Sequence, residues 1–308
     1  MRTDLLRVLV PAFSFALLLG VVFWLQPRTM SYLGLNLLFN LAVPIALATI
    51  AQMIVIALDD LDLSIGAFVS FCACVTATFL NDAPLVGAAI LLGAIGVYAL
   101  VGAVIWLRDL PSIVVSLGMS FVWSGLAVLI LPSPGGAAPE WVRAVMTVRP
   151  PVLPMAIVAS LAIAAVAHLV VMRSSFGTAL RGVGGNARSM QRAGWSVLSL
   201  RAGAYALAGL FGVMAGVALV GLTTAADANI ALRYTLLTIA GVILGGGEFN
   251  GGRVSAIGAV IGALTLTLAA SFLTFLRLSN DWQIGAQGAI LILVLAVRLV
   301  LNRRESYR

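Results

Sequence analysis

The stretch Ser174–Val197 reads SSFGTALRGVGGNARSMQRAGWSV and differs from the sequence on both sides of it. It carries Arg181, Arg188 and Arg192, together with four glycines in its first half. The chain before and after it is almost unbroken hydrocarbon. A polar, glycine-rich segment between long apolar runs indicates a loop on one face of a membrane-embedded bundle, because exposed irregular backbone does not occur in the hydrocarbon region.

The composition of the 308-residue chain also indicates a membrane protein. Hydrophobic residues make up 62% of it and charged residues only 9%, whereas soluble domains carry about 25% charged residues. Apolar runs of about 20 residues have the length of a transmembrane helix. We therefore predict an all-α membrane protein, a polytopic bundle of about ten transmembrane helices, some of them short or broken. The expected spans are 5–25, 36–57, 63–80, 84–107, 111–131, 152–172, 201–222, 233–247, 254–276 and 283–300.

The distribution of arginine sets the expected orientation. All 18 basic residues are arginines, and with the N-terminus inside thirteen of them fall on the inner side. This excess matches the positive-inside pattern, so both termini are expected in the cytoplasm. Residues 1–308 then form a single transmembrane domain with a cytoplasmic loop at about 173–200 and a long outer loop at 131–151. We interpret the first apolar run as an uncleaved membrane helix.

Several functions are disfavoured by the residues that are present. The net charge of +7 lacks a basic stripe with interleaved aromatic residues, so no nucleic-acid partner is expected. A Walker A loop needs a lysine, and the chain has none. Cys72 and Cys74 lie two residues apart, where helical side chains do not face each other, which favours packed thiols over a disulfide or a metal pair. His168 has no nearby partners for zinc or for catalysis, so a membrane enzyme is disfavoured.

Three acidic residues stand out in IALDDLDLSIGAF, residues 56–68. Charges near membrane segments are costly and indicate a functional site by default. Asp62 or Ser64 is expected to cap the following helix. Asp59 and Asp60 exceed what one cap needs, so we expect the turn to pair with an arginine or to line a water-filled path.

A second polar segment, LGGGEFNGGRVSAIGA, covers residues 244–259. Its run of three glycines does not support a regular helix, and Glu248 and Asn250 follow directly. A phosphate-binding loop would need a preceding strand and a lysine. A break between two helices is therefore expected, as in transporters that bind solute at discontinuous helices.

The remaining polar residues within the spans are uncharged, which favours a neutral hydrogen-bonding solute over an ion. The alternative for a single Ser or Thr is a hydrogen bond to its own helix. We assign the following residues to a translocation path or its gate: Asp59, Asp60, Asp62, Ser64, Asn36, Asn40, Ser116, Glu248 and Asn250.

Spaced glycine pairs allow helices to approach closely. Packing within one subunit is the expected role, and a contact between subunits is the alternative. The pairs are Gly212 and Gly216, Gly241 and Gly245, and Gly258 and Gly262.

Four stretches, in order along the chain, together resemble one protein family. They are LDLSIGAF at 61–68, LPSIVVSLGMSFVWSGLAVLI at 110–130, the opening stretch at 174–197, and VILGGGEFNGGRVSAIGAVIGAL at 242–264. This order is similar to that of permease subunits of ribose-type ABC sugar importers, over roughly residues 40 to 300. Asp59, Asp60, Glu248 and Phe249 depart from the family's usual residues. In the segment 174–197 the matching residues are Phe176, Gly177, Arg181, Gly184, Gly185, Asn186 and Gly194.

The resemblance implies a role for the segment 174–197. It would be the coupling segment that docks into a groove on a separate ATP-hydrolysing subunit. A helix over 187–197 with Asn186 as its N-cap is expected. Met190 and Trp195 would be apolar anchors, and the arginines of the segment (Arg181, Arg188 and Arg192) would face carboxylates on the partner. The alternative is that the arginines contact anionic lipid.

The resemblance also implies the partners. This chain would bind no cofactor, because ATP would bind the partner ATPase. Two permease subunits would form the pore in a bacterial inner membrane, and a periplasmic binding protein would deliver a ribose-type sugar. A nucleoside or a sugar-like signalling molecule is an alternative substrate. An ion-coupled secondary carrier, working alone, is an alternative class.

Overall fold

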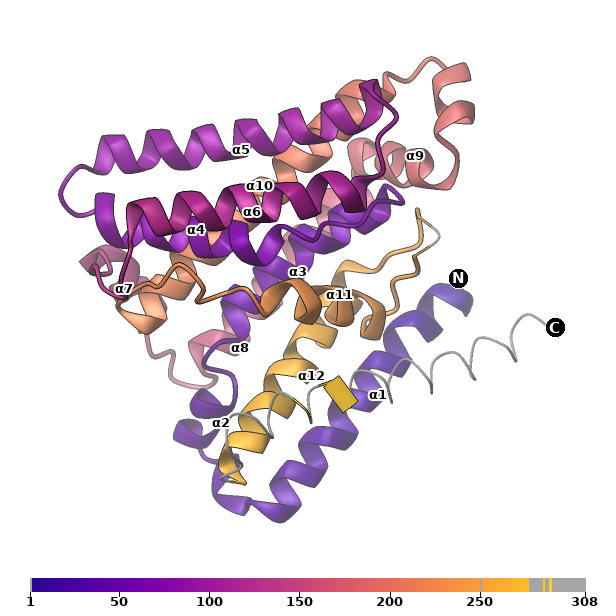
Figure 1. Ribbon diagram of the computed structural model, residues 1–308. Coiled ribbons are helices and arrows are strands. Elements are labelled where there is room, and N and C mark those ends of the chain that lie inside the picture. The colour runs from indigo at the N-terminus through magenta and orange to yellow at the C-terminus, as the bar shows by residue number, and fades with distance from the viewer. Residues whose placement is uncertain (1, 250, 277–284, 286–287, 290–308) are drawn as a thin grey trace.

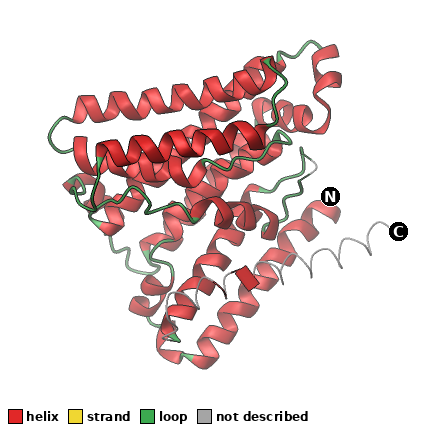
Figure 2. Cartoon of the chain, viewed as in Figure 1, coloured by secondary structure: helices red, strands yellow, loops and turns green. Residues whose placement is uncertain are grey.

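The computed structural model describes residues 2–249, 251–276, 285 and 288–289. These described residues form helices and loops without a β-strand (Figure 2), which confirms the predicted all-α class. The α-helices are α1 (Arg2–Leu25), α2 (Tyr32–Leu38), α3 (Ala42–Ala57), α4 (Ile65–Phe79), α5 (Pro84–Leu107), α6 (Ser112–Ile130), α7 (Glu140–Met146), α8 (Met155–Ala167), α9 (Ser175–Arg192), α10 (Val197–Thr223), α11 (Tyr234–Leu244) and α12 (Ala256–Phe275). A 3-10 turn η1 (Pro27–Met30) precedes α2, and a π-helical turn η2 (His168–Arg173) extends α8.

The predicted number of about ten spans is not confirmed. Within the described residues, five helices are long and apolar enough to cross a membrane, or six if α2 and α3, bent by 40° at their junction, count as one span. Three apolar helices in the same residues are shorter. The expected span 283–300 lies outside the described residues, apart from positions 285 and 288–289.

Two of the expected spans contain helices that are too short to cross. α4 has 15 residues and α11 has 11, so they rise about 23 Å and 17 Å, against a hydrocarbon core of about 30 Å. The connection between α10 and α11 runs beside α4, where the Ala231 N–H donates to the Ser70 hydroxyl at 3.0 Å. Ala226 and Ala231 are buried there. Non-helical backbone is tolerated at this depth because protein surrounds it.

The centre of the bundle is α3, every residue of which is buried. It packs against α10 and α12, and α10 also packs along α4 and α5 (Figure 1). A Cβ on Gly216 of α10 would lie 2.6 Å from the Cβ of Cys72. Spaced glycines therefore pack helices within this chain, as predicted. The two cysteines are buried free thiols, which confirms that interpretation as well.

The outer helices α5 and α6 are apolar yet mostly exposed. Only 28% of the apolar stretch of α5 and 17% of that of α6 is buried, against 61% for both α10 and α12. Leu85 on α5 and Leu129 on α6 are among the large exposed side chains. Such surfaces are stable against lipid tails, so these two helices face the bilayer or another membrane subunit.

Candidate functional site

The segment 174–197 folds mainly as a helix, α9, that projects at one end of the bundle (Figure 1). The expected loop at 173–200 is therefore mostly helical. The Ser174 hydroxyl caps its start by accepting from the Gly177 N–H at 2.9 Å. Asn186 interrupts the helix with φ −164° and ψ 93°. Its side-chain oxygen accepts from the Ser189 N–H at 2.9 Å, so the predicted N-cap at Asn186 is confirmed.

The helix ends earlier than expected. We predicted helix to Val197, but α9 stops at Arg192, and Val197 already belongs to α10. Gly194 takes φ +86°, a left-handed conformation that ends helices, and the Trp195 N–H donates back to the Met190 carbonyl at 3.1 Å.

The side chains of α9 divide into an inward and an outward set. Arg181 donates to the carbonyls of Gly177 and Met172, which holds it inside the chain. Met190 packs across Gly182. Arg188 and Arg192 are exposed, and neither makes an ion pair with the described residues. Trp195 is 44% exposed. Phe176 packs beside Gly203 of α10.

A junction of backbone atoms joins α9 to the rest of the molecule. Gly184 lies so close to the Ala57 carbonyl, at the end of α3, that an added Cβ would overlap it. The Gly252 N–H donates to that same carbonyl at 2.9 Å. Gly251, in the same loop, adopts φ +58° and contacts Gly184. The two glycine-rich motifs, distant in sequence, therefore meet at the end of α3.

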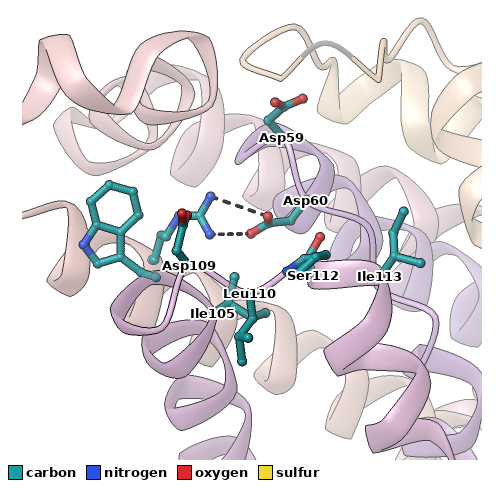
Figure 3. A pocket seen from close by; sticks show the side chains of 10 residues that line it. Asp59, Asp60, Ile105, Asp109, Leu110, Ser112 and Ile113 are labelled. Atoms are coloured by element: carbon teal, nitrogen blue, oxygen red, sulfur yellow. Dashed lines mark hydrogen bonds and ion pairs between the residues drawn. The ribbon is translucent and has the colours of Figure 1, made fainter.

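The acidic turn lies beside this junction and contains a buried ion pair. Asp60 accepts from Arg201 of α10 at 3.0 Å, an ion pair drawn in Figure 3. It also accepts from the Tyr205 hydroxyl at 3.1 Å. The predicted pairing with an arginine is confirmed. Burial raises the pKa of the Asp60 carboxyl, and the Arg201 guanidinium and the Tyr205 hydroxyl oppose that rise. Arg201 also lies over the Trp106 ring, 5.5 Å from its centroid.

Asp62 and Ser64 form a second buried network. The Asp62 carboxylate accepts from the Ser64 N–H at 2.6 Å and from the Tyr98 hydroxyl at 2.6 Å. The N-cap position of α4 is Ser64, but no side chain caps the helix, so neither predicted cap is confirmed. Asp62 instead holds the Ser64 residue just before the first turn. Ser64 directs its hydroxyl to Asp62 and not to the helix.

Ser116 serves the same turn. Its hydroxyl accepts from the Leu63 N–H at 3.0 Å, and Ser112 accepts from the Leu61 N–H at 3.1 Å. Both serines are buried. The assignment of Ser116 to a solute path stays a prediction, while its hydrogen bonds show that it holds the acidic turn on α6.

The pocket at this end has a volume of about 260 Å³. Figure 3 shows Asp60 and Ser112 beside it, with Asp59 directed away from the ion pair. Asp59 is exposed and adopts φ +67°. Glu248 pairs with Arg253 across the neighbouring loop at 3.3 Å. Asn250 lies outside the described residues. We call this end of the bundle, with α9, the acidic turn and the loop 245–255, the α9 end.

Asn36 and Asn40 lie elsewhere, beyond the opposite end of α3. They line a second pocket of about 150 Å³. α3 has 16 residues, which separates this region from the acidic turn by about 24 Å. We call this the α7 end, because the chain that follows α7 forms one wall of the pocket. The residues predicted for one path therefore fall into two groups.

The sequence of the chain matches, over residues 34–295, the family described as the permease component of the branched-chain amino acid transport system. The chain belongs to this permease family. It is 26% identical over 286 residues to the probable ABC transporter permease protein YphD of Escherichia coli (strain K12), covering 89% of this chain and 85% of YphD. It is 28% identical over 294 residues to the autoinducer 2 import system permease protein LsrC of Yersinia pestis (strain Pestoides F), covering 90% of this chain and 80% of LsrC. No solved structure matches it.

The resemblance to ABC importer permeases is thereby confirmed, and the permease is a multi-pass membrane protein. Sequence reasoning missed four side chains that complete its polar networks. They are Tyr98, Ser112, Arg201 and Tyr205. The available signal was the acidic turn itself, because carboxylates near apolar segments need buried partners. The sequence did not show which of the arginines on the predicted inner side would be the partner.

Proposed function

We propose that this permease is the membrane-spanning subunit of an ATP-driven importer and that α9 docks on a separate ATPase subunit. The observation that carries this is the kinked α9, which projects from the bundle with exposed Arg188 and Arg192 beside a half-exposed Trp195. Exposed cations that pair with none of the described residues, and an exposed aromatic ring, are features of a docking surface. Carboxylates on the ATPase would pair with the two arginines.

The junction at Gly184 supports the same role. A displacement of α9 acts directly on the Ala57 carbonyl of α3 and on the loop that carries Gly252. Docking at α9 thus has a mechanical route into the bundle, as alternating access requires. The proposed motion follows ATP binding and closure of the ATPase subunits, and this chain performs no covalent chemistry and holds no cofactor.

The proposed topology places the α9 end in the cytoplasm of a bacterium. α1 begins at the end of the bundle where α9 lies (Figure 1), in keeping with an N-terminus on the same side. The C-terminus is proposed there as well, from the positive-inside pattern. A second permease subunit would complete the pore, and a periplasmic binding protein would deliver the solute at the α7 end.

The proposed substrate is a ribose-type sugar. A sugar-like signalling molecule is a second candidate, favoured by the likeness to LsrC, which is named for autoinducer 2 import. A nucleoside is the remaining alternative. Within the described spans the polar side chains not engaged at the α9 end are largely neutral, which suits any of these solutes.

The test is to purify the chain with the ATPase encoded beside it and to measure ATP hydrolysis in proteoliposomes. We expect hydrolysis to rise only when a loaded binding protein is added. In the variant Gly185→Val with Arg188→Glu, ATPase association should be lost. Gradient-driven uptake by the permease alone, without any associated ATPase, would replace this proposal with a secondary carrier.

A further inference from the structure

We infer that the pocket at the α7 end binds a small polyhydroxylated solute and that Asn36, Asn40 and Arg149 read its hydroxyl groups. This inference rests on the proposed import function and adds a recognition site on the permease itself. It concerns the α7 end alone and uses none of the polar residues of the α9 end.

The pocket forms where a membrane helix is broken. α2 and α3 meet at an angle of 40°, and Asn40 lies in the break. Asn36 lies one turn earlier, on α2. The Ser271 hydroxyl of α12 donates to the Leu38 carbonyl at 2.8 Å and so satisfies backbone that the break exposes. Discontinuous helices of this kind supply solute sites in transporters.

The outer loop supplies the other wall. α7 packs on α10, where a Cβ on Gly221 would lie 2.7 Å from Met146. This contact fixes the chain that follows α7, so that Thr147 and Arg149 border the pocket. The segment 131–151 had no assigned role from the sequence, and here it closes a pocket over the helix break.

Three polar side chains of this pocket, Asn36, Asn40 and Arg149, are available to a ligand. Asn36 is half-buried and Asn40 is exposed. Within the described part of the chain, neither amide hydrogen-bonds another protein group, and Arg149 makes no ion pair. An amide both donates and accepts, and a guanidinium offers five N–H donors. Together they match a solute that presents several hydroxyl oxygens.

The charge and size of the pocket narrow the solute class. Among the described residues that border it none is acidic, and Arg149 contributes a positive charge. A cationic solute would meet this charge without compensation, so the pocket selects against amines. Its volume of about 150 Å³ is below the range of about 300–1,000 Å³ seen for drug-sized ligands, which suits one small molecule.

The direct test is thiol labelling of Asn40→Cys in membranes with a membrane-impermeant maleimide. Cys72 and Cys74 are fully buried, so their background labelling should be low. We expect Asn40→Cys to react from the outside, and free ribose should slow this reaction at least threefold. No binding protein is added, so protection reports the permease pocket alone.

Two matched positions complete the test. Glu140→Cys, exposed on α7 and outside the pocket, should react from the outside at a rate that the solute does not change. Ser189→Cys, exposed on α9, should react only after permeabilisation. Equal labelling of Asn40→Cys with and without free ribose would overturn the inference. So would equal protection of Glu140→Cys.

A transport measurement gives an independent readout. In proteoliposomes with ATPase and binding protein, Asn36→Ala and Asn40→Ala should each raise the KM for uptake by about three- to tenfold while kcat stays near the wild-type value. An unchanged KM in both variants would contradict the inference. If wild-type proteoliposomes show no ATP-dependent uptake, the import proposal fails, while the labelling experiment still judges the pocket, because it needs no ATPase.

Discussion

The polar side chains near the two ends of α3 differ in whether they have protein partners. At the α9 end, Asp60 is paired with Arg201 and Asp62 is bonded to Ser64 and Tyr98. At the α7 end, Asn36 and Asn40 border a pocket without a protein partner among the described residues. Paired buried groups hold a structure in place, whereas unpaired polar groups on a pocket are available to a ligand. The difference supports the proposals that the α9 end transmits movement and that the α7 end binds the solute.

The largest expected effect is at the buried ion pair. Asp60→Asn keeps the shape of the side chain but leaves the Arg201 guanidinium, 12% exposed, without its carboxylate. The loss should be about 3–5 kcal/mol of unfolding free energy, because an uncompensated buried charge remains. Thermal and denaturant unfolding of the purified permease in detergent measures this effect.

The matched control is Asp59→Asn, one residue away, exposed and with its left-handed backbone preserved. It should change stability by less than about 0.5 kcal/mol. Adding Arg201→Met to Asp60→Asn should recover part of the loss. If both single asparagine variants behave alike, the ion pair does not stabilise this end.

A smaller effect is expected at the glycine junction. Gly184→Ala places a methyl group against the Ala57 carbonyl, so α9 and α3 must separate. We expect a loss of about 1–3 kcal/mol, as for overpacking elsewhere. Gly185→Ala is the control, since no atom outside its own helix backbone and chain neighbours lies within 4 Å of an added Cβ there. Equal melting temperatures of the two variants would show that the junction yields without cost.

The serine on α6 tests whether the acidic turn is held in place from the side. Ser116→Ala leaves the Leu63 N–H without its acceptor and should cost about 1–2 kcal/mol. Ser120→Ala removes only a hydrogen bond within the same helix, to the Leu117 carbonyl, and should cost about 0.5 kcal/mol or less. A larger loss in Ser120→Ala than in Ser116→Ala would contradict this role.

The smallest effect on stability is expected at the α7 end. Asn40→Ala should leave the unfolding free energy within about 0.5 kcal/mol of the wild type while weakening uptake as described above. Asn81→Ala is the reverse case, because the Asn81 amide donates to the Ala137 carbonyl at 2.8 Å. It should lower stability slightly and leave KM unchanged. A loss of unfolding free energy clearly larger than this in Asn40→Ala would show that Asn40 stabilises the fold and does not serve only to bind solute.

Sequence reasoning succeeded where local chemistry decides the outcome. The Asn186 cap follows from a capping residue between glycines and a helix-forming segment, and the α5 bounds coincide with the expected span 84–107. It failed on depth. The segment 224–233 is rich in alanine, and composition alone does not show that it runs as irregular backbone beside α4. Such a path depends on long-range acceptors such as Ser70, which a local pattern does not reveal.

Sequence reasoning named residues of the candidate site but did not predict that they lie at two separate ends of α3. The sequence placed Asn36, Asn40, Asp60 and Asp62 in one group, because each is polar near apolar segments. Only the three-dimensional arrangement shows that α3 separates them. From the sequence, Arg201 contributed only to the excess of arginine on the predicted inner side. Nothing in its own helix indicates that it contacts the Asp60 carboxylate, which lies in the turn after α3.

The complete burial of α3 has a consequence for energy coupling. A helix enclosed on every side has little room to bend, and densely packed interiors transmit strain. Displacement at Ala57 would therefore reach the Asn40 bend as a movement of the whole helix. If the proposed ATP-driven import holds, substitutions that loosen α3 without unfolding the protein should produce futile cycling, in which the partner ATPase consumes ATP at the normal rate while solute stays outside.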